Sequence, residues 1–208
     1  MADIMEKIHW LGHSSFAVYG SRTVCLDPYR ISGSRKADLI LVSHTHADHF
    51  SPEDIARVAG EKTTLVISAD ASPDYPAHVI TMRPGDKIEL MGLVVEAIPA
   101  YNLSKPYHPR TNDWLGFILT IDGIRLYHAG DTDFIPEMRG LVADVGLIPI
   151  GGTYTMEHDE AAEAVKAMKL TRAVPMHWGG IVGTEKDASA FKELVGQASD
   201  VIIMKKEA

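Results

Sequence analysis

Four side chains that can bind a metal lie within six residues of one another: His44, His46, Asp48 and His49. Neutral imidazole suits Zn, Cu, Fe and Ni, whereas Mg and Ca prefer sites built from oxygen alone. The residue types and their spacing therefore predict a transition-metal centre. The simpler interpretation is a histidine-rich surface loop that binds nothing.

The segments on either side favour the metal centre. Residues 39–42 form an apolar run that predicts a buried strand. Ser51-Pro52-Glu53-Asp54 predicts the start of a helix over residues 52–58, ending at Gly60, because it offers a Ser cap, Pro in the first turn and then acids. The histidines then occupy a tight strand-to-helix loop, which can direct alternate side chains toward one point.

Two further candidates follow predicted strands later in the chain. Asp131 lies in Gly130-Asp131-Thr132 behind residues 124–128, and His177 follows residues 173–176. A carboxylate at Asp131 can bridge two cations, although an aspartate that merely forms an Asx-turn is the alternative. A lone histidine at a strand end is usually structural, but the other candidates favour a metal ligand here.

Composition limits the class of protein and its partners. The 208 residues are 46% hydrophobic, which suits one domain over residues 1–208. The formal charge of −8, with acids spread along the chain, argues against nonspecific nucleic-acid binding and against an anionic membrane, so we expect no nucleic acid and no membrane as partners. No apolar leader or membrane-length run occurs, so we expect a cytoplasmic protein; the oligomeric state stays open. The single cysteine, Cys25, cannot form an internal disulfide and is expected to be buried.

The predicted elements repeat a pattern. Hairpins are followed by strand-helix units, and the same order then recurs, which suggests two similar halves with a mixed sheet each. A second helix is expected behind Asp159 and a third is expected to be capped by Asp187. The strands are predicted at residues 8–11, 16–19, 23–26, 39–42, 64–68, 79–82, 87–90, 93–98, 117–121, 124–128, 145–150, 173–176 and 201–204.

Five motifs together resemble the metallo-β-lactamase fold superfamily. His44-Thr45-His46-Ala47-Asp48-His49 matches its HxHxDH signature. The set is similar to the branch of small single-domain hydrolases that includes ascorbate-phosphate lactonase and N-acyl-phosphatidylethanolamine phospholipase D. The other four motifs are Gly12-His13-Ser14-Ser15-Phe16, Leu26-Asp27-Pro28, Ala129-Gly130-Asp131-Thr132-Asp133 and Met176-His177-Trp178-Gly179.

This resemblance implies an α/β (α+β) fold, a four-layer αββα sandwich with two mixed sheets inside and helices outside. It implies two metal ions per chain, Zn²⁺ or alternatively Mn²⁺ or Fe²⁺. His44 and His46 would hold metal one, Asp48, His49 and His177 metal two, and Asp131 would bridge them. Asp48 and Asp131 are the catalytic candidates, and Asp48 would pass a proton to the leaving group.

The third ligand of metal one departs from the family pattern. Most relatives carry a histidine directly behind the strand equivalent to residues 94–99, where this chain has Ala100-Tyr101-Asn102. The nearest histidine is His108. Donor strength favours His108 and simple position favours Asn102; we predict His108 and keep Asn102 as the alternative.

The remaining polar and aromatic candidates have two interpretations each. His13 either lines the site or has a structural role, and Asp27 either supports the metal loop or ends a strand. His128 is expected behind the ligands, and Asp133 either lies behind them or acts as a cap. Lys105 and Arg110 could meet an anionic substrate or be solvated. The aromatic candidates for a pocket wall, each with a core alternative, are Tyr107, Trp114, Tyr154 and Trp178.

The predicted function is a metal-dependent hydrolase that uses a metal-bound hydroxide to cleave an ester, lactone or phosphodiester bond of a small, anionic substrate. The alternative is a non-catalytic metal- or ligand-binding member of the fold with an altered third ligand. Iron redox chemistry is disfavoured because iron members tend to carry Glu at the position of His46. RNA processing is disfavoured because the chain lacks a basic surface and extra domains.

Overall fold

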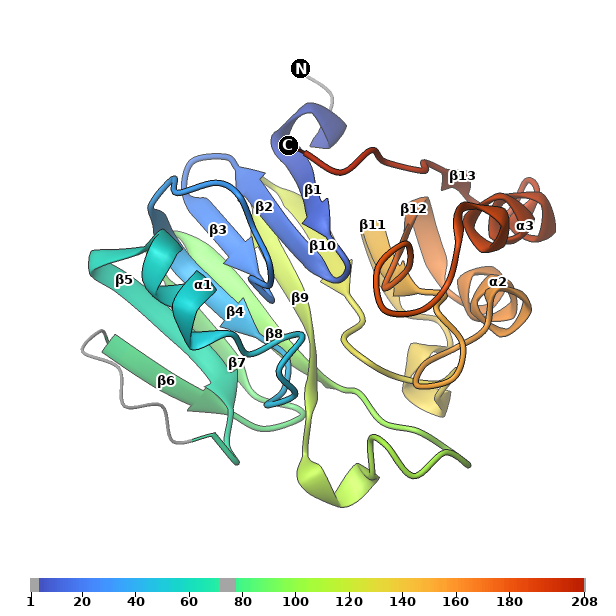
Figure 1. The fold of residues 1–208 in the computed structure, drawn as a ribbon, viewed down its shortest axis with the longest axis horizontal. Helices are drawn as coiled ribbons and strands as arrows, with labels where there is room; N and C mark the ends of the chain where they lie inside the picture. The colour runs from blue at the N-terminus through green and yellow to red at the C-terminus, as the bar shows by residue number, and fades with distance from the viewer. Residues whose placement is uncertain (1–3, 72–77, 208) are drawn as a thin grey trace.

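Two mixed β-sheets form the centre of the computed structural model, which describes residues 4–71 and 78–207 (Figure 1). In the first sheet β1, β2 and β3 pair antiparallel, and β3 to β6 then pair parallel. Its strands follow chain order: β1 (Ile8–Gly12), β2 (Ser15–Tyr19), β3 (Thr23–Leu26), β4 (Ala37–Val42), β5 (Ala59–Ser68) and β6 (His78–Met82).

The second sheet repeats this arrangement. Strands β7 to β10 pair antiparallel, and β10 to β13 pair parallel. The two predicted halves, each with a mixed sheet, are therefore confirmed. The strands are β7 (Lys87–Leu90), β8 (Leu93–Pro99), β9 (Leu115–Ile121), β10 (Ile124–His128), β11 (Val142–Pro149), β12 (Lys169–Met176) and β13 (Asp200–Val201).

Strand β4 shows how the layers are built. Leu39 and Leu41 belong to the large core that also contains the second sheet, whereas Ile40 and Val42 pack with Ile55 of α1 (Pro52–Val58). Successive side chains of a strand point to opposite faces, so one strand serves both apolar layers. Figure 1 places α1 over the first sheet, and α2 (His158–Ala167) and α3 (Glu185–Val195) together beside the second. The predicted αββα order is confirmed.

Two local predictions were wrong, both near the end of the chain, whereas helix α1 has the predicted bounds. The residue after α1, Ala59, already begins β5, so Gly60 lies in that strand. Thr184, not Asp187, is the N-cap of α3; Asp187 is the third residue of a capping box and accepts hydrogen bonds from the Thr184 backbone and hydroxyl. Strand β13 stops at Val201 instead of continuing to residue 204.

The end of the chain leaves the second sheet for the first. After β13 the backbone runs to β1, where Glu207 N donates to Trp10 O at 2.9 Å. Figure 1 accordingly shows the segment after β13 running from the second sheet to β1. Short 3₁₀ turns lie at Ile4–Lys7, Arg110–Asn112 and Pro136–Met138. Among the described residues, no helix has the length and apolar character needed to cross a membrane.

Candidate metal centre

The predicted ligands come from four segments that meet where strands end. The loop behind β4 carries the four residues of the HxHxDH motif, the segment between β8 and β9 carries His108, and β10 and β12 lead into Asp131 and His177. Their ligand atoms fall into sets whose members lie within 4.8 Å of one another. The sets are His44, His46 and His108; His13, Asp48, His49 and His177; and His44, His49 and Asp131.

Asp131 lies between the first two sets. Its Oδ2 is 3.0 Å from His177 Nε2 and 3.3 Å from His108 Nε2, and its Oδ1 is 3.2 Å from His49 Nε2. One carboxylate thus contacts histidines of both groups, which is the position that a bridging ligand requires.

Buried polar atoms without hydrogen-bond partners converge on this carboxylate. Across the part of the chain that the structure describes, they include the Nε2 atoms of His44, His49, His108 and His177 and the Oδ1 of Asp131. Leaving such atoms unsatisfied costs free energy, about 1–3 kcal/mol each. Cations would satisfy all of them, and a set rich in imidazole with a few carboxylates fits Zn²⁺ or a similar transition metal.

Asp27 holds the metal-binding loop in place. The buried carboxylate accepts hydrogen bonds from Ser43 N at 2.7 Å, from Ser43 Oγ at 2.6 Å and from His49 Nδ1 at 2.7 Å. Because Nδ1 of His49 donates to Asp27, its Nε2 is left as the metal-facing acceptor. Of the two interpretations of Asp27, the structure supports the one in which it braces the loop.

Ser43 fixes His44 in the same way. Its hydroxyl donates to Asp27 and lies 2.9 Å from His44 Nδ1, so it accepts the proton of that nitrogen and leaves Nε2 free. Ser43 was not among the predicted site residues. Its position directly before the first histidine was the only signal that could have identified it.

His108 reaches the centre and Asn102 does not. His108 is buried, and its ring centroid lies 5.2 Å from that of His44 and 4.9 Å from that of His46. The Oδ1 of Asn102 instead accepts from His108 N at 3.0 Å and lies 3.0 Å from His108 Nδ1. Asn102 therefore orients His108, so this arrangement supports His108 as the third imidazole of the group.

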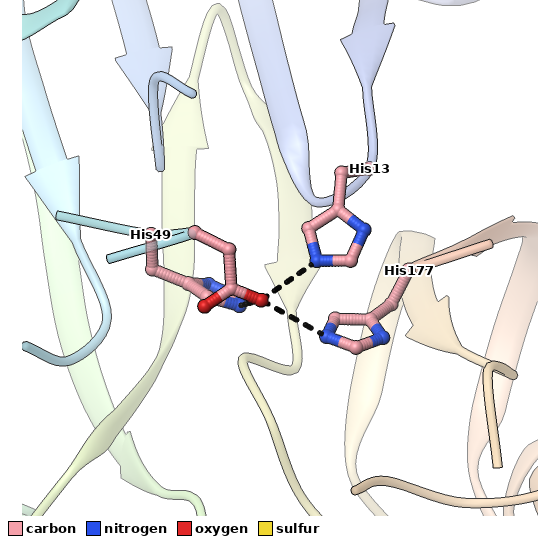
Figure 2. A group of neighbouring side chains, drawn as sticks. His13, His49 and His177 are labelled. Atoms are coloured by element: carbon pink, nitrogen blue, oxygen red, sulfur yellow. Dashed lines mark hydrogen bonds and ion pairs between the residues drawn. The ribbon is translucent and has the colours of Figure 1, made fainter. Parts of the chain in front are cut away.

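His13 joins the other group. Its Nε2 lies 3.1 Å from Asp48 Oδ2, and its ring packs against that of His177, with 3.9 Å between centroids and 43° between planes. Figure 2 shows His13, His49 and His177 pointing toward one another from three separate segments. The hairpin turn is joined to β12 by a hydrogen bond from His177 N to His13 O at 3.0 Å. His13 thus lines the site rather than having only a structural role.

The backbone is left-handed at three of these positions. His13, Asp27 and His177 have φ values of 52°, 42° and 58°. Such conformations cost about 1–3 kcal/mol in non-glycine residues and cluster at functional sites. Gly130 is also left-handed, with φ 64°, and a Cβ there would lie 2.4 Å from Leu115 O. Only glycine therefore fits directly before Asp131.

The pKa shifts of the site residues favour the binding of cations. Burial lowers the pKa of His44 and, less strongly, that of His46, so both are neutral ligands at neutral pH. Burial acts in the same direction on His49, but the Asp131 and Asp27 carboxylates outweigh it and raise the His49 pKa well above its usual value. Burial would raise the pKa of Asp48, yet the hydrogen bond from His13 and the charge on His49 lower it to about 2. A cation would replace the proton that these carboxylates attract.

A cavity of about 300 Å³ opens onto the centre. Asp48, His108 and Asp131 lie at its base, and Tyr107 and Tyr154, in edge contact at 4.7 Å between centroids, form a wall. Of the two interpretations of Tyr107 and Tyr154, pocket wall or core, the structure supports the pocket wall. Trp114 instead packs against His44, with 4.8 Å between centroids, and donates Nε1 to Asp70 at 2.7 Å.

Other candidates are engaged elsewhere. Lys105 pairs with Asp133, and Arg110 pairs with Glu137 at 3.1 Å, so neither lines this cavity. Asp133 also accepts from Asn102 Nδ2, which places it behind the His108 segment as expected. His128 Nε2 lies 2.9 Å from Ser14 O and supports the hairpin turn rather than Asp131.

Known proteins that are similar to this chain belong to one superfamily and are named as metal-dependent hydrolases. The model of the β-lactamase superfamily domain matches residues 7–177. The chain is 35% identical to a UPF0173 metal-dependent hydrolase of Thermococcus kodakarensis, over 96% of each chain. It is 34% identical to another of Pyrococcus horikoshii, over 97% of each.

Two similar solved structures are also named as metal-dependent or metallo hydrolases. A crystal structure from Parabacteroides distasonis, provisionally named a metal-dependent hydrolase, is similar with a TM-score of 0.84 and 30% identity, over 94% of this chain and 91% of that one. Igni18, a metallo hydrolase from Ignicoccus hospitalis, is similar with a TM-score of 0.78 and 25% identity, over 97% of this chain and 95% of the other.

Proposed function

The chain belongs to the β-lactamase superfamily and is a metal-dependent hydrolase of the UPF0173 type, and from that premise we propose that it cleaves an ester, lactone or phosphodiester bond in a small, anionic substrate. The observation that carries the proposal is the convergence of buried, unpartnered histidine nitrogens on the Asp131 carboxylate at the base of an open cavity.

The candidate ligands form two groups, one for each metal ion. We assign His44, His46 and His108 to one metal, Asp48, His49 and His177 to the other, and Asp131 to both. Zn²⁺ is the proposed ion, with Mn²⁺ or Fe²⁺ as substitutes that the same donors accept. Bound there, the ions would supply a Lewis acid and a water nucleophile that ionises near neutral pH.

The protein's own groups orient the reaction. Asp48 lines the cavity and is part-exposed, and His13 holds its Oδ2 at 3.1 Å. A carboxylate fixed at this border between ligand group and cavity can receive a proton and return it to the leaving group. Tyr107 and Tyr154 bound the space on the side of the His108 segment and restrict the substrate's approach.

The alternative of a non-catalytic metal binder depended on a missing third imidazole for metal one. In the structure His108 supplies an imidazole beside His44 and His46. This arrangement supports three imidazole ligands for metal one, and the relatives' names agree with hydrolysis.

Metal analysis combined with a substrate panel tests the proposal. Purified protein should contain close to two ions per chain, lose hydrolysis after treatment with EDTA, and recover it with Zn²⁺ or Mn²⁺. The panel should pair esters, lactones and phosphodiesters that carry a negative charge with their neutral counterparts. Hydrolysis that persists in protein shown to be free of metal would eliminate the metal-dependent mechanism, and full occupancy without turnover on any class would favour the binder.

A further inference from the structure

A second cavity, of about 340 Å³, adjoins the cavity over the metal centre, since Tyr29 and Ile181 line both. We propose that it is the subsite for a planar, anionic part of the substrate, held between an aromatic wall and two cations, Arg30 and Lys206. This assignment rests on the proposed hydrolase function and specifies its substrate class.

The wall is aromatic and rigid. Trp10 and Trp178 stack with 4.9 Å between centroids and 29° between planes, and both line the cavity. Their ring nitrogens are already satisfied, Trp10 Nε1 by His13 O at 2.9 Å and Trp178 Nε1 by Pro175 O at 3.0 Å. These groups hold the rings in place, so the wall offers apolar, planar surface rather than free donors. Such surface favours stacking of a flat ring.

Two cations from distant parts of the chain lie at the same cavity. Arg30 follows β3 and lies over the Tyr29 ring, with its guanidinium carbon 5.0 Å from the centroid. Lys206 is on the C-terminal segment; its Nζ lies 3.2 Å from the position that a Cβ on Gly12 would occupy. The hydrogen bond from Glu207 N to Trp10 O fixes that segment against β1.

Neither cation forms an ion pair within residues 4–71 and 78–207. Some other basic residues do: Lys7 pairs with Asp122 at 2.7 Å, Arg83 with Asp113 at 2.7 Å and Arg125 with Glu96 at 2.7 Å. What distinguishes Arg30 and Lys206 from other unpaired cations in the described part of the chain, such as Arg139 and Lys205, is that both line this cavity. In a chain with a formal charge of −8, two unneutralised cations at one cavity mark a place where an anion is attracted. Solvated surface charges would be the simpler interpretation, but they would not share a cavity with a stacked aromatic wall.

The subsite lies at the correct place to position a scissile bond. His13 lines this cavity, and its Nε2 contacts Asp48 of the metal group at 3.1 Å. A ligand that fills the subsite therefore contacts His13, the residue that holds Asp48. The volume lies at the lower end of the range for small-molecule sites, which suits a single flat ring system bearing a carboxylate or phosphate.

Binding of a matched probe pair tests the subsite. The probes are 2-naphthoate and its neutral analogue 2-naphthamide, titrated into metal-loaded protein by calorimetry. Wild-type protein should prefer the naphthoate. The double variant R30Q/K206Q should lose at least about tenfold in naphthoate affinity, roughly the effect of losing one charge-assisted hydrogen bond, and should bind the amide as before. The matched control is R139Q/K205Q, which removes two exposed cations that do not line the cavity.

A space-filling variant tests the same subsite without changing charge. A Cβ on Gly180, which lines the cavity, would meet no atom within 4 Å, so Gly180→Leu should fold and reduce the binding of both probes. Equal naphthoate affinity in wild-type protein and R30Q/K206Q, or no naphthoate binding at all, would overturn the subsite even if esters are hydrolysed. Charge-dependent binding in a protein that hydrolyses nothing would support the subsite and refute the proposed function instead.

Discussion

The Oδ1 of Asn102 lies 3.0 Å from both the backbone nitrogen and the Nδ1 of His108. One amide oxygen therefore fixes the main chain and the ring of the same residue, and the amide nitrogen of Asn102 is engaged by Asp133 and Tyr154 O. Both lone pairs of that oxygen are used. The residue that occupies the usual ligand position thus acts through a histidine six positions further on.

This relationship predicts different effects for two alanine variants. His108→Ala should lower the metal content from two ions toward one, because a donor is removed. Asn102→Ala should retain two ions but lower the affinity for one of them about 10- to 100-fold, because only the partner that orients His108 is lost. Elemental analysis and chelator competition measure both, with the exposed His78→Ala as control. The reverse pattern would transfer the ligand role to Asn102.

Asp131→Ala should remove most of the hydrolytic activity and lower metal content while the protein stays folded. The carboxylate contacts histidines of both ligand groups, so its loss should weaken both metals together. Elemental analysis, turnover and circular dichroism should be measured on the same preparations, with Asp159→Ala in the exposed first turn of α2 as control. Normal metal content with normal turnover would end the bridging assignment.

Asp27→Ala should destabilise even the metal-free protein. The substitution leaves Ser43 N, Ser43 Oγ and His49 Nδ1 without their buried acceptor, at about 1–3 kcal/mol for each unsatisfied group. Urea unfolding of protein with and without metal separates this cost from any change in metal affinity. Unchanged unfolding midpoints would show that the loop does not depend on Asp27.

Local sequence was sufficient for most of the elements. Residues 52–58 and 124–128 were predicted with the bounds that the structure has, because caps, a hairpin turn and apolar runs are local signals. The metal-binding loop was predictable for the same reason. The αββα order was not, since it depends on how the two sheets pack, and only the resemblance implied it.

Contacts between distant segments could not be predicted from local sequence signals. The Asn102–His108 contact depends on the path of a proline-bearing loop, and the Arg30–Lys206 cavity on a C-terminal segment that returns to β1. Residues 201–204 are a continuous apolar run typical of a strand, yet pairing stops at Val201 and the chain then runs toward the first sheet. An apolar run reports suitability for a sheet and not the presence of a partner strand.

Cys25 predicts how stability changes at alkaline pH. The thiol is buried in the layer between the first sheet and α1, and burial raises its pKa to about 12. The unfolded thiol ionises near its ordinary pKa of about 8.5, so above that pH the unfolded chain binds fewer protons than the folded one. The free energy of unfolding should therefore fall as pH rises between about 9 and 12. Burial also raises the pKa of Tyr127, so the contribution of Cys25 is the difference between wild-type protein and Cys25→Ala.

Two measurements check this prediction. Urea unfolding across that pH range should show a shallower decline in Cys25→Ala than in wild-type protein. In native protein at mildly alkaline pH, iodoacetamide should label Cys25 only as fast as the chain opens, because the thiolate is the reactive form. Labelling of native protein at the rate of a free thiol, or parallel pH profiles for the two proteins, would show that the folded structure does not hold Cys25 in its neutral form.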